Sequence, residues 1–277
     1  MPPSPLTAAL AGALFSAVPL SAAEPVAPPP APTYADLASI ADTAALVVRV
    51  RVKEQAAVPA ERAPGLAPAH ARLYVEAQTL ALLSGTTALP ESLRYLVDVP
   101  LDAKGKTPKL KKQEFILFAR PVPGRPGEIQ LAGPRAQLRH NPELEQRLRP
   151  VLAALAAADA PARVTGVRDV LSSVGNLAGE SETQIFLTTA GGEPAALTVV
   201  RRPGMAPRWG VSWTELVDQS ARPPARETIA WYRLACALPG ALPGRANLAS
   251  DPADRARAAQ DYRFVIEQLG PCARNLS

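Results

Sequence analysis

A valine-rich stretch near the start of the chain alternates apolar and basic residues. In AALVVRVRV, residues 44–52, and the lysine that follows, Val48, Val50 and Val52 alternate with Arg49, Arg51 and Lys53. Successive side chains of a strand point to opposite faces, so this period of two predicts a strand with one buried face and one face in water. We expect the first half of the folded chain to be built around this strand.

Four more strands and a helix are predicted around it. Residues 71–82 and 93–99 alternate in the same way and end at glycine or proline. Residues 114–120, EFILFAR, are almost continuously apolar, which is typical of a strand buried on both faces. Residues 128–132 form the fifth candidate, and residues 34–42 a short helix. Five strands and one short helix predict a closed or nearly closed β-barrel domain over residues 34–140.

The second half of the chain mixes helices and strands. Residues 141–162 are expected to connect the two halves through a helix, capped by Asn141 and kinked or split at Pro150. Residues 164–174 are ambiguous. Residues 183–189, 195–201 and 208–213, separated by Gly and Pro turns, predict a three-stranded antiparallel meander. Two helices follow, one at residues 225–238 and one capped by Asp251. The expected fold class is therefore α+β, with an α+β module over residues 163–277.

The order of these elements resembles a known architecture. AALVVRVRV, ARLYVEAQTLALLSG, LPESLRYLVDV and KLKKQEFILFAR resemble the OB-type barrel of secreted modules related to the netrin and tissue-inhibitor fold, over about 100 residues. The disulfides of the animal modules are missing, so the resemblance does not imply their protease-binding function. The whole chain also resembles uncharacterised exported proteins of proteobacteria through GNLAGESETQIFL, RRPGMAPRWGVSW and TIAWYRLAC. That resemblance implies no particular activity.

The N-terminal residues predict export. Residues 1–23 carry no charged side chain, are mostly apolar and end in Ser-Ala-Ala, as in a signal peptide removed before Glu24. A retained membrane anchor is the alternative, although Pro19 interrupts a stretch already short for a bilayer. Residues 24–33 are predicted to be a stiff proline-rich linker. No later apolar run is long enough to span, so we expect a periplasmic or secreted protein with no membrane span after signal removal.

The chain contains two cysteines, Cys236 and Cys272. In an oxidising compartment such a pair forms a disulfide, which here would join the ends of the last two helices. Two unpaired buried thiols are the alternative.

Residues typical of catalysis are scarce. There are only two histidines, and no nucleotide-binding or metalloprotease motif is present. We therefore expect no catalytic residue, no metal site and no cofactor, and interpret the chain as a binding or envelope-assembly protein rather than an enzyme. A hydrolase with an unrecognised active site is the alternative, and a structural protein without a small ligand is a third possibility.

One loop is strongly basic in a chain of net charge +5. Five of the six lysines fall within KGKTPKLKK: Lys104, Lys106, Lys109, Lys111 and Lys112. The loop is interpreted either as a solvated hairpin tip that keeps a sheet edge from pairing or as a binding patch for an anionic envelope component. Aromatic residues are not interleaved, so no nucleic acid is expected as a partner. Another exported protein is the second candidate partner.

A second group of candidates surrounds the PGMAP turn. It comprises Arg201, Arg202, Arg208 and Trp209, with Trp213 nearby. Exposed tryptophans beside arginines would form a binding surface, because these residues dominate interface hot spots. Buried tryptophans would instead form the core of the module. The spacing of Trp209 and Trp213 places both on one face of a strand and favours the core interpretation.

Overall fold

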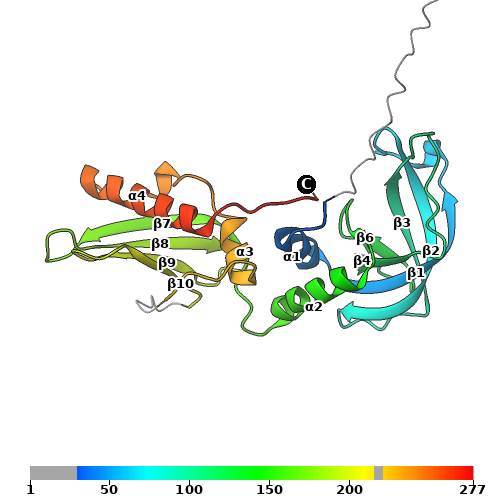
Figure 1. The fold of residues 1–277 in the computed structure, drawn as a ribbon, viewed down its shortest axis with the longest axis horizontal. Coiled ribbons are helices and arrows are strands. Elements are labelled where there is room, and N and C mark those ends of the chain that lie inside the picture. Colours follow the sequence, from blue (N-terminus) through cyan, green and yellow to red (C-terminus); the bar gives the residue numbers. More distant parts are fainter. Residues whose placement is uncertain (1–29, 215–220, 277) are drawn as a thin grey trace, which may run out of the picture. The chain divides into compact units, whose positions relative to one another are not determined.

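The structure, a computed structural model, describes residues 30–214 and 221–276, and residues 32–277 form one compact unit. The predicted signal peptide and most of the predicted linker lie outside the described residues. The described chain forms four α-helices and two antiparallel sheets, which makes it an α+β protein (Figure 1). Within it, no helix is both long and apolar enough to cross a bilayer.

The elements are, in chain order, α1 (Tyr34–Thr43), β1 (Leu46–Ala57), β2 (His70–Ser84), β3 (Ser92–Pro100), β4 (Glu114–Pro121), β5 (Ile129–Leu131), β6 (Gln137–Arg139), α2 (Pro142–Ala156), β7 (Val164–Val174), β8 (Ser181–Thr189), β9 (Ala196–Arg201), β10 (Arg208–Ser212), α3 (Ile229–Ala235) and α4 (Pro252–Leu269). Short 3-10 turns lie at Ala60–Arg62 and Gly244–Ala246.

The first sheet is organised around β1. Its strand order is β3-β2-β1-β4-β5, and β6 also pairs with β4. Val48, Val50 and Val52 are buried in a core shared by β1 to β5. The sheet is not closed by a ladder, because β3 approaches β5 only through a single bridge between Arg94 and Glu128. The predicted closed or nearly closed barrel is therefore not confirmed.

The other face of β1 differs from the prediction of a strand half in water, whereas β4 is buried on both faces as predicted. Val47, Ile116 and Phe118 are buried in a second core formed with α1 and α2. These helices cover the first half of β1, so only its later part presents a polar face to solvent. Burial of residues 115–119 on both faces of β4 follows from the same arrangement.

Pro150 does not split α2, although a split was one of the two outcomes predicted for it. The helix runs unbroken from Pro142 to Ala156, with Asn141 accepting the backbone N–H of Leu144. Pro150 is exposed, so the carbonyl that loses its partner one turn earlier can bond to water. The helix therefore continues although Pro150 removes one of its backbone hydrogen bonds.

The C-terminal tail is tied to the first helix. Thr33 and Asp36 form a capping box at the start of α1. The buried Asp36 carboxylate also accepts the backbone N–H groups of Asn275 and Leu276 at 2.9 and 3.3 Å. Burial opposes ionisation of Asp36, but the N–H donors outweigh it and lower its pKa below the usual value.

The second sheet has four strands instead of the predicted three. Its order is β10-β9-β8-β7, so the ambiguous residues 164–174 form its last strand. One face packs on α4, where Leu197, Val199 and Tyr262 are buried together. Figure 1 shows α4 lying along this face. The helix predicted at residues 225–238 is shorter, Ile229–Ala235, because Thr228 caps its start.

The predicted disulfide is present. Cys236 follows α3 and Cys272 follows α4, and their Cα atoms are 5.1 Å apart. The Trp231 Nε1–H donates to the Leu269 carbonyl at 2.9 Å nearby. The two helices are thus joined by a covalent bond and a buried hydrogen bond.

Candidate functional site

The lysine-rich loop joins β3 to β4 and is held in place at its first turn. The Asp102 carboxylate accepts the backbone N–H groups of Lys104 and Lys106, both at 2.8 Å. This Asx-type turn leaves both lysine side chains exposed.

The second half of the loop is attached to β1. The Gln55 side chain accepts the backbone N–H of Leu110 and donates to the Pro108 carbonyl. Leu110 is only 6% exposed and belongs to the first core. The Lys112 N–H donates to the Val52 carbonyl at 2.9 Å. Lys112 has a φ of 69°, a backbone conformation that residues other than glycine rarely adopt. The loop is therefore attached to β1 through both backbone and side-chain hydrogen bonds.

The sixth lysine lies on the same surface. Lys53 follows Val52, the residue of β1 to which the loop is bonded, and is exposed. All six lysines of the chain thus lie on the loop and on the strand beside it; we call Lys53, Lys104, Lys106, Lys109, Lys111 and Lys112 the lysine surface. Lys111 pairs with Glu54 at 2.6 Å, and no other member has an ion-pair partner among the described residues.

The two interpretations of the loop can be compared on this geometry. The loop does lie along the edge of β1 beyond the end of its pairing with β4. That edge is covered by loop backbone and by Gln55, whereas the lysine side chains point into solvent. Protection of the β1 edge therefore explains the path of the loop backbone, but it does not explain why the loop carries five lysines.

The residues around the PGMAP turn separate onto two faces of the second sheet. The Arg201 guanidinium donates to Asp261 at 2.6–2.7 Å on the face covered by α4. Trp209 is 6% exposed and lies in the same core, and its Nε1 has no hydrogen-bond partner among the residues that the structure describes. Arg202 and Arg208 lie on the opposite face, as strand alternation requires.

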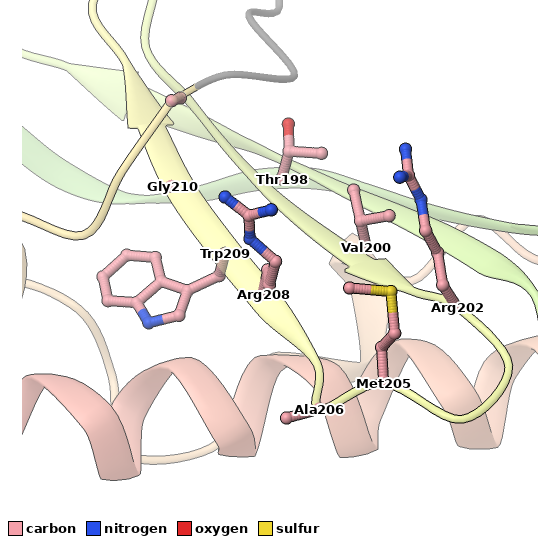
Figure 2. Close-up of a pocket in the computed structure, with 9 residues that line it drawn as sticks. Thr198, Val200, Arg202, Met205, Ala206, Arg208, Trp209 and Gly210 are labelled. Carbon is pink, nitrogen blue, oxygen red and sulfur yellow. The ribbon is translucent and has the colours of Figure 1, made fainter.

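That opposite face carries a hollow of about 60 Å³. Figure 2 shows Thr198, Val200, Arg202 and Arg208 on one side of the sheet and Trp209 turned towards the helix. We call the hollow the Thr198 trough; it is lined by Thr198, Val200, Arg202, Met205, Ala206, Arg208, Trp209, Gly210 and Ala221.

A group of titratable side chains lies between α2 and the first sheet. Glu145 accepts hydrogen bonds from Arg49 at 3.1 Å, from His140 at 2.9 Å, and from Arg149. Glu114 is bonded to Arg51 at 2.6 Å, and this bond lowers its pKa below the usual range. Both carboxylates are thus bound by arginine. The bond between Glu145 of α2 and Arg49 of β1 attaches the helix to the sheet.

Metal-binding geometry is not found within residues 30–214 and 221–276, where no three His, Cys, Asp or Glu side chains gather suitably. No model of a known protein family matches the chain. No curated protein matches it either.

Sequence reasoning omitted three residues that shape these surfaces. Lys53 was assigned only to the solvent face of a strand, and Gln55 and Thr198 were not considered. The contribution of each depends on pairing between segments far apart in the chain, for which a single sequence carries no direct signal.

Proposed function

We propose that this is an exported binding protein of the cell envelope, periplasmic or secreted and without catalytic activity, that attaches to an anionic envelope component through the lysine surface. The observation that carries the proposal is the gathering of all six lysines on one ordered loop and its neighbouring strand. The remaining basic residues of the chain are arginines.

The chemistry of lysine supports an extended, multiply charged partner. An ammonium group is a hydrated point charge on a flexible stem and adapts to phosphates or carboxylates in varied positions. Near an anionic surface each basic residue contributes about 1 kcal/mol, so six lysines offset by Glu54 and Asp102 supply roughly 4 kcal/mol. The fixed loop reduces the ordering cost of binding.

Two features support export. The first is the predicted signal peptide at residues 1–23, and the second is the disulfide between Cys236 and Cys272, a bond that persists in oxidising compartments. The OB-type barrel also belongs to this proposal. It is supported by the position of β1 between β2 and β4 and by the bridge that brings β3 towards β5.

The alternative of a hydrolase has less support. Hydrolysis needs titratable groups free to exchange protons with a substrate. In the cluster around His140, arginines bind both Glu114 and Glu145.

Co-sedimentation with lipid vesicles tests the proposal. The mature protein is mixed with vesicles of phosphatidylcholine, with or without phosphatidylglycerol, and with a sulfated polysaccharide in a parallel arm. We expect binding to the anionic vesicles or polysaccharide, and its loss when the five loop lysines are replaced by glutamine.

The matched control variant undergoes the same change in net charge, again by replacement with glutamine. It replaces five exposed arginines without ion-pair partners in the described chain: Arg62, Arg94, Arg120, Arg135 and Arg139. Equal loss of binding in both variants would show that net charge alone is responsible and would contradict the proposal.

A further inference from the structure

We infer that the Thr198 trough is a binding site for a small organic anion, in which a carboxylate or phosphate group is joined to a short apolar stem. This site lies on the second sheet and shares no residue with the lysine surface. The inference does not depend on the proposed function.

Two cationic side chains border the trough and are not neutralised. Arg202 and Arg208 are exposed, and their guanidinium groups form neither a hydrogen bond nor an ion pair with any other described residue. Figure 2 shows them rising on either side of Val200. Glu182 lies opposite Val200 in the β8–β9 ladder, but its carboxylate accepts a hydrogen bond from Gln184 at 2.9 Å. Guanidinium groups bind carboxylate and phosphate through paired N–H donors.

Thr198 also lines the trough and contributes a hydroxyl group to it. Thr198 is only 5% exposed. In Figure 2 the side chain of Thr198 lies on the same side of the sheet as the side chains of Arg202 and Arg208. A threonine hydroxyl can both donate and accept a hydrogen bond, so it can bind a polar atom of a ligand in the trough.

The trough is also bordered by backbone at one end and has an apolar wall. At one end the backbone of Ala221 lies directly over Gly210, where a Cβ atom would be 2.2 Å from the Ala221 carbonyl. At the other end Met205, which is 56% exposed, lies beside Val200. An apolar stem along Val200 and Met205 would remove these atoms from water. The arrangement thus selects an anion with a short apolar chain.

Binding of matched probes to the full mature protein tests the inference. Hexanoate, hexyl phosphate, inorganic phosphate and hexylammonium are titrated while amide chemical shifts are followed by NMR. We expect saturable shifts at Thr198, Val200 and Gly210 with hexanoate or hexyl phosphate, and none with hexylammonium. Stronger binding of one of the two anions identifies the preferred head group.

Substitutions distinguish the site from non-specific attraction. Arg202→Gln and Arg208→Gln should each weaken binding about tenfold, because each removes a charge-assisted hydrogen bond. Arg139→Gln removes an exposed, unpaired charge on the first sheet and should have no effect. Absence of saturable shifts in the wild-type protein, equal binding of inorganic phosphate and hexyl phosphate, or equal effects of all three substitutions would overturn the inference. An unchanged near-UV spectrum shows that each variant is folded.

Discussion

Replacing Asp261 by alanine is expected to destabilise the protein by about 3 kcal/mol. Asp261 is fully buried on α4 and accepts the Thr183 hydroxyl at 2.5 Å and Arg201 at 2.6–2.7 Å. Removing one partner of a buried ion pair costs about 3–5 kcal/mol, because the other charge loses its compensation. The lower end applies because the Arg201 side chain is 24% exposed and can turn towards water. Thr183 also keeps Ser172 as a partner, at 2.9 Å.

Urea unfolding with the disulfide intact measures this loss. Far-UV circular dichroism and tryptophan fluorescence are followed together, because coincident transitions justify a two-state free energy. A variant with Asp261→Leu and Arg201→Met removes both charges and should lie within about 1 kcal/mol of the wild-type protein. A loss below about 1 kcal/mol for Asp261→Ala, or a larger loss in the double variant, would refute the reasoning about this pair.

Three further predictions concern stability. The chain positions of Cys236 and Cys272 differ by 36 residues, so replacing both with alanine should lower the unfolding free energy by about 4 kcal/mol in urea titrations. Leu148→Ala should cost about 2–5 kcal/mol by the same assay, because Leu148 is fully buried between α2 and the first sheet. The hydrogen bonds from Arg72 lower the pKa of Asp98. The ionised Asp98 carboxylate therefore stabilises the fold above about pH 4, and this stabilisation is lost as the pH falls through the pKa of Asp98 in the folded protein. Asp98→Asn should make the urea midpoint less dependent on pH between about 2 and 5, and an unchanged acid dependence would contradict this assignment.

The alternation of residues predicted most of the strands because a period of two is a local property. The β1 valines and the continuous apolar run of β4 were identified in this way, and the structure buries both. The cap at Asp251 also marked the start of α4 correctly, since the interaction spans only three residues. Features that depend only on residues close together in the chain can be predicted from a single sequence.

The failures have a common physical cause in long-range packing. Residues 164–174 pair with β8 through an irregular register, with shifts near Val164 and Val167, so their alternation is disrupted. The three residues of β6 form a strand only because β4 offers them an edge. Pro150 was expected to kink or split α2. Its exposed position depends on the surface against which α2 packs, which the sequence alone does not show.

The candidate surfaces show the same division. Lysine composition identified the loop, but its attachment through Gln55 and Leu110 required the pairing of β1 with residues more than fifty positions away. Likewise, the sequence grouped Arg201 with Arg202, whereas the fold directs one to Asp261 and the other to the opposite face. The different environments of Arg201 and Arg202 can be assigned only when the position of α4 is known.

Amine footprinting tests the proposed attachment most directly. The six lysines and the N-terminal amine are the reactive amines of the mature chain, so acetylation followed by mass spectrometry reports on the lysine surface. The protein is labelled alone, with phosphatidylcholine vesicles, and with vesicles containing phosphatidylglycerol. We predict that anionic vesicles slow acetylation of Lys104, Lys106, Lys109 and Lys112, and that added salt abolishes the protection. Equal acetylation rates in all three conditions, with the protein co-sedimenting with the anionic vesicles, would show that it binds through another surface.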